Sequence, residues 1–136
     1  MANTPQYAFG YGLSYTTFKY HDLKLSSAKI GPADSLLVSF KLTNTGKLAG
    51  EEVAQLYLRD MVAQPLRPVK ELKGFKKLML KPGQTKEVQF VITKESLSFY
   101  DDKLEWITQP GAFKMMIGSA SDDIRLEEDF ELESGN

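Results

Sequence analysis

The strongest constraint in this sequence is the recurrence of apolar residues at every second position in short segments, with mostly polar neighbours between them. In residues 36–42, the apolar side chains Leu36, Val38, Phe40 and Leu42 occupy every second position. A period of two places all four on one face of a β-strand, with their neighbours on the other face. The same spacing recurs at 88–92 and 113–117, and at 124–132, where Glu128 breaks the apolar face once. The chain therefore contains several half-buried strands.

Turn-forming residues separate these segments at intervals of about ten residues, and no segment carries the pattern of a long helix. Short strands at this spacing are typical of two sheets packed face to face. We therefore predict an all-β, immunoglobulin-like (fibronectin type III-like) antiparallel β-sandwich of about seven to eight strands. The expected strands cover residues 16–25, 36–42, 50–60, 71–80, 88–92, 104–107, 113–117 and 124–132.

The first expected strand changes phase partway along its length. Phe18 and Tyr20 share one face, whereas Leu23 and Leu25 have the opposite parity. An extra residue in a strand moves the following side chains to the other face. We therefore expect a β-bulge near Asp22, or a strand that changes sheets there.

Four further segments carry local signals. Residues 50–60 have apolar side chains on both faces, which indicates a central strand. Residues 81–84 (Lys-Pro-Gly-Gln) have the residue order of a type II turn. Residues 94–100 fit a single helical or 3₁₀ turn that crosses between the sheets. Residues 61–69 contain two prolines, so we expect a loop there.

One segment follows neither a strand nor a helix pattern. Residues 9–18 hold aromatic side chains at positions 9, 11, 15 and 18, together with two glycines. Aromatic side chains each bury roughly 150–250 Å² when packed. This segment therefore either folds back on its own domain or docks on a partner outside the chain. We divide the chain into a linker and docking segment, residues 1–15, and a sandwich, residues 16–136.

Charge is balanced overall but uneven along the chain. The net charge of −1 gives no general attraction to nucleic acid or to a membrane surface, and we expect neither as a partner. Residues 66–87 are rich in lysine, and residues 121–136 are rich in aspartate and glutamate. We interpret the two stretches as complementary solvated faces of neighbouring strands, with a basic docking patch as the alternative.

No constellation of residues indicates catalysis or metal binding. The chain has no cysteine and one histidine, His21, so we expect no metal site and no cofactor. A glycosidase needs two carboxylates that face each other across a cleft. We interpret the adjacent pair Asp101-Asp102 as a polar turn, and the pair Glu51-Glu52 as solvated charge at the start of a strand.

The sequence also lacks the signals of membrane insertion. No apolar run approaches the roughly 20 residues of a membrane span. Residues 1–7 lack the basic and apolar regions of a signal peptide. Because the chain can be a piece of a longer protein, this last observation does not fix the location of its parent.

Six motifs are spread along the chain. They are Phe9-Gly-Tyr-Gly-Leu-Ser-Tyr-Thr-Thr-Phe18, Thr43-Asn-Thr-Gly46, Gly50-Glu-Glu-Val-Ala-Gln-Leu-Tyr57, Arg67-Pro-Val-Lys-Glu-Leu-Lys-Gly-Phe75, Leu80-Lys-Pro-Gly83 and Phe99-Tyr-Asp101. In type and order they resemble the C-terminal fibronectin type III-like domain of glycoside hydrolase family 3 enzymes. These enzymes are mostly β-glucosidases and β-xylosidases. The resemblance extends over residues 9–118, which is most of the chain.

The resemblance implies a parent enzyme that hydrolyses β-linked glucosides or similar sugars with retention, and that is periplasmic or secreted. In this family the nucleophilic aspartate lies in an N-terminal barrel domain, and the acid/base glutamate usually lies in an α/β sandwich domain. No residue of this chain matches either motif, so we assign no catalytic residue. The implied function is a non-catalytic accessory domain that packs on and braces those two domains. The isolated domain could also self-associate through its docking surface.

The resemblance also suggests where docking occurs. It places residues 9–15 at the junction with the preceding domain, and the proline-bounded loop is a second candidate contact. The candidate interdomain docking residues are Phe9, Tyr11, Leu13, Tyr15, Pro65, Arg67 and Pro68. The alternative function is a module that binds polysaccharide or another plant-wall polymer, including lignin. Its candidate aromatic residues are Tyr57, Tyr100 and Trp106.

Overall fold

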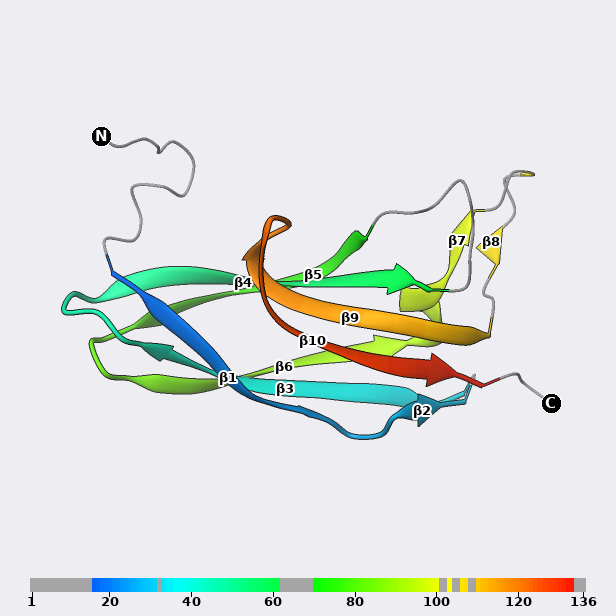
Figure 1. Cartoon of the computed structure of the whole chain (residues 1–136), viewed down its shortest axis with the longest axis horizontal. Helices are drawn as coiled ribbons and strands as arrows, with labels where there is room; N and C mark the ends of the chain where they lie inside the picture. Colours follow the sequence, from blue (N-terminus) through cyan, green and yellow to red (C-terminus); the bar gives the residue numbers. More distant parts are fainter. Residues whose placement is uncertain are drawn as a thin grey trace.

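A computed structural model of the chain describes residues 16–31, 33–61, 70–100, 103, 106–107 and 110–133. These residues form the predicted all-β sandwich (Figure 1). The strands are β1 (Phe18–Leu25), β2 (Lys29–Ile30), β3 (Ser35–Asn44), β4 (Gly50–Asp60), β5 (Glu71–Leu80), β6 (Thr85–Thr93), β7 (Phe99–Tyr100), β8 (Trp106–Ile107), β9 (Gly111–Ala120) and β10 (Asp123–Leu132). A 3₁₀ turn, η1 (Lys94–Leu97), follows β6.

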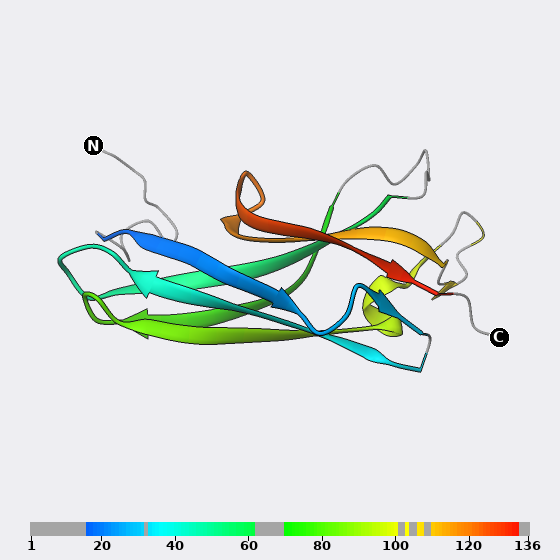
Figure 2. The same ribbon diagram turned by 60° about the horizontal axis from the view of Figure 1, so that its bottom comes forward.

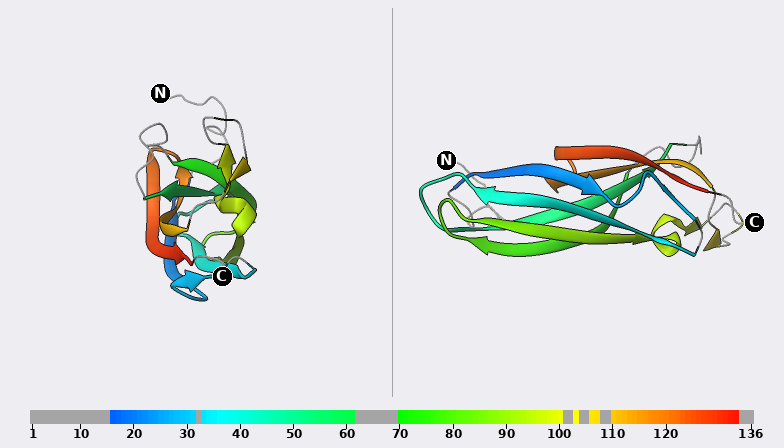
Figure 3. Two further views of the ribbon diagram at one scale, coloured as in Figure 1. Left: turned by 90° about the vertical axis from the view of Figure 1, so that its right-hand side faces the viewer. Right: turned by 90° about the horizontal axis from the view of Figure 1, so that it is seen from below.

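Two sheets enclose the core. One has the order β1-β3-β6, and the other has the order β2-β10-β9-β4-β5. Figure 2 shows β1, β3 and β6 in one layer, with β9 and β10 in the other. All long strands pair antiparallel with their neighbours, and the short β2 pairs parallel with β10. Seen end-on in Figure 3 (left), the sheets wrap around a shared interior.

The alternating pattern forms that interior as predicted. The four apolar residues of β3 at positions 36, 38, 40 and 42 are at most 1% exposed. Their partners in β6 include Val88, Phe90 and Ile92, which are also buried. The Phe40 ring stacks between the ring of Tyr20, at 5.7 Å, and the ring of Phe90, at 6.3 Å. The second sheet covers this aromatic row with the buried side chains of Ala54, Leu56, Leu58, Met115 and Ile117.

The predicted bulge in β1 is confirmed. The pairing of β1 with β3 shifts between His21 and Lys24, and Asp22 has a φ of 57°. Aspartate tolerates this left-handed conformation better than most residues do. After the shift, Leu23 and Leu25 still pack against the core, because the chain leaves the first sheet to add β2 to the second.

The predicted turns are also confirmed. Gly83 has a φ of 79°, and the Gln84 N–H donates to the Lys81 carbonyl oxygen over 2.9 Å, as a type II turn requires. The single turn after β6 is the 3₁₀ element η1. It leads into the β7–β8 pair, which lies at the end of the sandwich opposite to the start of β1 (Figure 1).

The two charged stretches are not neighbours, contrary to the prediction. Most of the basic residues lie on β5 and most of the acidic residues lie on β10. These two strands are separated by β9 and β4 in one sheet. Their ion pairs are with adjacent strands instead. The Lys77 ammonium lies 3.9 Å from Glu51, and the Lys114 ammonium lies 3.9 Å from Glu127 and 3.8 Å from Asp129. The five-stranded sheet therefore carries its basic stretch on the edge strand β5 and its acidic stretch on β10, at the other side of β9 and β4.

Phe40→Ala should lower the free energy of unfolding by about 3–5 kcal/mol, because it removes a ring stacked on both sides and leaves a cavity. Val91→Ala is the matched control on β6, since Val91 is 59% exposed, and it should cost less than about 1 kcal/mol. Urea unfolding of both variants measures the difference. Equal losses would show that the aromatic row is not the centre of the core.

Candidate functional site

The predicted docking residues lie outside the described part of the chain. They belong to residues 1–15 and to the loop at 62–69. Their docking role therefore stays a prediction. The residues concerned are Phe9, Tyr11, Leu13, Tyr15, Pro65, Arg67 and Pro68.

Of the three candidate polymer-binding aromatics, one has a described side chain. Tyr57 lies on β4 and is 8% exposed, with its hydroxyl donating to Gln55 Oε1. Little of its ring is available to stack on a sugar. Tyr100 and Trp106 are register partners in the backbone pairing of β7 with β8. Their side chains lie outside the described part of the structure.

The best-defined polar site surrounds Asn44 at the end of β3. Asn44 is fully buried. Its Oδ1 accepts hydrogen bonds from Thr16 Oγ1 at 2.8 Å and from the Gly46 N–H at 2.9 Å. Its Nδ2 donates to the carbonyl oxygens of Leu48, at 2.8 Å, and Leu80, at 3.0 Å. Every hydrogen-bonding position of this buried amide is therefore used.

Backbone hydrogen bonds join the same segments. The Asn44 N–H donates to the Gln84 carbonyl oxygen, and the Gly83 N–H donates to the Asn44 carbonyl oxygen. The Thr45 N–H donates to the Thr17 carbonyl oxygen over 2.8 Å. We call this cluster the Asn44 joint. It ties together the start of the described chain, the β3–β4 loop and the β5–β6 turn.

Gly46 makes the close approach of Thr16 possible. A Cβ atom at position 46 would lie 1.7 Å from Thr16 Oγ1 and 3.0 Å from the Thr17 nitrogen. Any larger residue would push the incoming chain away from the β3–β4 loop. Three of the sequence motifs, those ending at Phe18, Gly46 and Gly83, thus meet at one joint. Their convergence depends on strand pairing and was not predicted from the sequence.

A second polar cluster links the two sheets beside this joint. The Tyr20 hydroxyl, on β1, donates to Glu52 Oε2, on β4, over 2.8 Å. Glu52 is thus not a solvated edge charge, as the sequence had suggested. Its partner in β5 is Leu78, which packs on the core, so the Glu52 side chain shares the inward face with Ala54. Period-two alternation back from Ala54 was the signal that could have found it.

Arg125 completes this inter-sheet cluster from β10. Its Nη1 donates to the Phe18 carbonyl oxygen over 3.1 Å, and its guanidinium carbon lies 5.3 Å from the centre of the Tyr20 ring. Asp123 holds the guanidinium through Oδ1 at 2.8 Å and Oδ2 at 3.0 Å, and also accepts from Ser119 Oγ. A lone arginine in an acidic stretch was the sequence signal for this role.

Burial and hydrogen bonding shift the pKa values of the groups in this cluster. Desolvation raises the pKa of the Glu52 carboxyl, and the Tyr20 hydrogen bond and the Arg125 charge only partly offset it. Desolvation and then the charge of Glu52 raise the pKa of the Tyr20 phenol. The hydrogen bonds from Arg125 and Ser119 lower the pKa of Asp123. The negative charge of Glu52 is therefore held between the two sheets at a cost in desolvation free energy.

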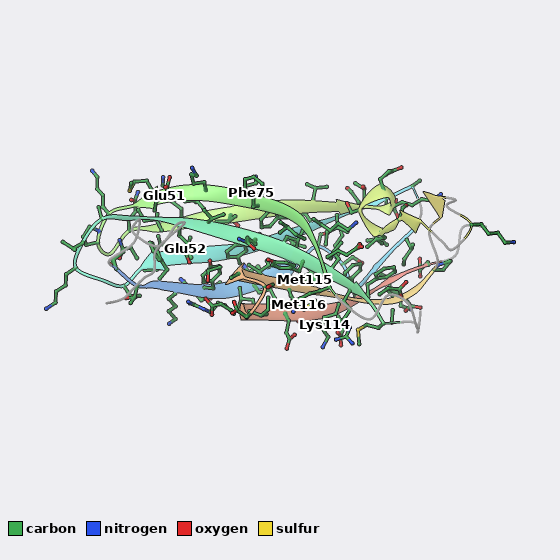
Figure 4. The ribbon with its side chains drawn as sticks, turned by 90° about the horizontal axis from the view of Figure 1, so that it is seen from above. Glu51, Glu52, Phe75, Lys114, Met115 and Met116 are labelled. Carbon is green, nitrogen blue, oxygen red and sulfur yellow. The ribbon has the colours of Figure 1, made fainter. Side chains whose placement is uncertain are left out.

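The outer side of the five-stranded sheet carries an apolar surface at its β5 edge. Leu72, Phe75 and Met79 of β5 are 50%, 65% and 57% exposed. Figure 4 looks onto this surface and labels Phe75 on β5 and Met116 on β9. We call these three β5 residues the β5 face. In the sequence, Phe75 stands out only as the last residue of the Arg67–Phe75 motif.

The described residues include no group of three or more histidine, aspartate or glutamate side chains that could hold a metal ion. A surface hollow of about 260 Å³ lies where the chain crosses from β1 to β2, and it is lined by Leu23, Leu25, Ser27, Ala28, Glu128 and Asp129. In the same described ranges, no helix has the length and apolar character needed to cross a membrane.

Asn44→Ala should lower the free energy of unfolding by more than about 2 kcal/mol, because buried groups left unpaired cost about 1–3 kcal/mol each. Gln89→Ala, which truncates an exposed amide on β6, is the control and should change stability by less than about 0.5 kcal/mol. Equilibrium unfolding in urea measures both. A loss at position 44 as small as the control's would contradict the structural role of the joint.

Glu52→Gln should become more stabilising, relative to the unchanged chain, as pH rises from 4 to 8. The raised pKa of Glu52 means that its contribution is fully present below the pKa of the unfolded chain and is lost as pH rises through the folded-state pKa. Glutamine keeps an acceptor for Tyr20 and carries no charge. Urea unfolding at several pH values, with Glu87→Gln as an exposed-carboxylate control, tests this trend. A pH-independent difference at position 52 would refute it.

Comparison with known proteins bears on the identity of this sandwich. A profile described as the fibronectin type III-like domain matches residues 52–121. The β-glucosidase BoGH3A of Bacteroides ovatus is 48% identical over 93% of this chain and 17% of its own length. The periplasmic β-glucosidase of Salmonella typhimurium is 48% identical over 86% of this chain and 15% of its own.

A solved structure agrees. A β-glucosidase from Erythrobacter marinus superposes with a TM-score of 0.82 at 40% identity, over 93% of this chain and 17% of the other. The chain thus spans a small part of the length of these relatives, which confirms the resemblance drawn from the motifs. Since the profile covers just over half of the sequence, the chain belongs to the fibronectin type III-like domain family, in the form found in family 3 β-glucosidases.

Proposed function

We propose that this chain is a non-catalytic accessory domain of a longer β-glucosidase-like glycoside hydrolase, and that it packs on and braces the catalytic domains. One observation carries the proposal. Nearly the whole chain, 93%, aligns with only 17% of a β-glucosidase, so most of such a protein lies outside this domain. In the parent, the barrel domain and the α/β sandwich domain supply the nucleophile and the acid/base residue, and they are the domain's intramolecular partners.

The Asn44 joint supports a bracing role. It holds Thr16 and Thr17 against the β3–β4 loop, at the point where the chain arrives from residues 1–15. A joint with a fully bonded, buried amide allows little rotation of the incoming chain. The domain would therefore be presented to its neighbour in one orientation, which lowers the entropic cost of docking.

The name of one relative bears on where the parent enzyme is located. One relative is named as a periplasmic β-glucosidase. We propose that the parent is likewise periplasmic or secreted, where it would meet β-linked sugars.

Removing this domain from the parent enzyme should lower the parent's apparent melting temperature and its yield of active enzyme, because the domain's contacts brace the catalytic domains. The 136-residue chain alone should release no nitrophenol from an aryl β-glucoside above the rate without protein. Differential scanning calorimetry and a colorimetric assay measure the two effects, with the full-length parent as the reference. Hydrolysis by the isolated chain would refute the non-catalytic assignment.

The same protein sample tests the alternative function. A pull-down on insoluble cellulose, xylan and lignin should leave the chain in the supernatant. Retention on one of these polymers, removed by changing Tyr100 or Trp106, would instead support a polymer-binding module. Tyr57 offers that alternative little, since the residue is 8% exposed.

A further inference from the structure

We propose that the β5 face is the surface through which this domain docks on the remainder of its parent polypeptide. This inference rests on the proposed function and names the face that carries it. The occupant is the neighbouring domain of the same chain, which would present an apolar surface bordered by carboxylates opposite β5.

The strand register places the β5 face on the outside of the sheet. Leu78 and Leu80 of β5 point to the core, where Leu80 is fully buried and Leu78 packs against it. Phe75 and Met79 have the opposite parity, and Leu72 joins them because the pairing shifts between Leu56 and Tyr57. These three large apolar side chains are each half exposed or more on one side of one strand.

The outward positions on the neighbouring strands are apolar but buried. Leu72 is the register partner of Tyr57, and Tyr57 is the register partner of Met116 on β9. Tyr57 and Met116 are only 8% and 6% exposed, so they add little accessible area. The apolar surface open to a partner on this side of the sheet is therefore the β5 face itself.

The charge beside the β5 face fits an acidic partner. Lys77 has the same parity as Phe75 and Met79, its side chain is 62% exposed, and its ammonium lies 3.9 Å from Glu51. Lys76 instead has the parity of the core-facing residues, with its ammonium 6.0 Å from the centre of the Phe90 ring. The domain's own acidic stretch lies on β10, beyond β4 and β9. A surface that covers Phe75 would bring its rim against Lys77. Carboxylates in that rim would be attracted.

The outer side of the three-stranded sheet is a weaker candidate. Its exposed large apolar residues are one cross-strand pair, Leu37 and Val91, at 39% and 59%. The positions around the pair are polar, including Ser39, Gln89 and Lys41. This face exposes two large apolar side chains where β5 exposes three, so it serves as the internal comparison.

A domain in the same polypeptide also has a concentration advantage over a second copy. A covalent connection of modest length gives an effective concentration of about millimolar. The relatives show that most of such a polypeptide lies outside this domain. At micromolar protein, the tethered neighbour occupies the β5 face before another molecule does.

Thiol labelling tests the proposal. The chain has no cysteine, so Phe75→Cys and Val91→Cys each introduce one reactive group, at 65% and 59% exposed positions of different sheets. Both should label at similar rates in the 136-residue chain. In the full-length parent, labelling at position 75 should slow by about ten-fold or more, because it then waits for the interface to open. Labelling at position 91 should stay fast. Peptide mass spectrometry measures both sites.

The other outcomes separate this inference from the proposed function. Slow labelling at 91 and fast labelling at 75 would overturn the choice of face while leaving a docked domain. Fast labelling at both sites would overturn the β5 face, and the proposed function would fail with it only if removal of the domain also left the parent's melting temperature unchanged. Protection of position 75 in the isolated chain that increases with protein concentration would identify a second copy as the occupant and would overturn the proposal.

Discussion

The architecture of one end of this domain depends on the burial of a single amide. Moving an amide out of water is unfavourable unless each of its polar atoms finds a partner. The Asn44 amide has four hydrogen-bond partners. Thr16 and Leu80 lie 28 and 36 residues away in the sequence, and Gly46 and Leu48 belong to the loop that follows β3. The arrangement exists only when the incoming chain, the β3–β4 loop and the β5–β6 turn are all in place. The start of the sandwich therefore forms as a cooperative unit.

The inter-sheet cluster works by a different principle. Phe40 and its aromatic neighbours hold the sheets together by apolar burial, which sets no particular lateral position. The Tyr20 hydroxyl and the Arg125 guanidinium are directional, and each reaches across from one sheet to the other. Burial raises the pKa of the Glu52 carboxyl, so keeping this carboxylate charged between the sheets costs stability at neutral pH. Such a cluster favours one alignment of two sheets that apolar contacts alone would leave loose.

The two outer faces of the sandwich differ, and this difference underlies the proposed docking surface. An exposed edge strand with apolar residues is an aggregation hazard, and lysines along such a strand are a common protection. β5 carries both features, with Phe75 and Met79 beside a series of lysines. A docking partner within the same polypeptide would cover the apolar side chains, and the lysines would keep the strand soluble until it does.

The long strands, the bulge at Asp22 and the turn at Gly83 could be predicted from the sequence, because alternation and backbone preference are local properties. The short strands β2 and β7 were not predicted. The family could also be recognised, because six motifs occur along the chain in the family's order. Which strands are neighbours became clear only from the tertiary structure, in which β5 and β10 are separated by β4 and β9. The tertiary structure likewise turned Glu52 inward toward Tyr20 and left Phe75 outside. Those outcomes depend on pairing between distant segments, which a period of two along the chain does not encode.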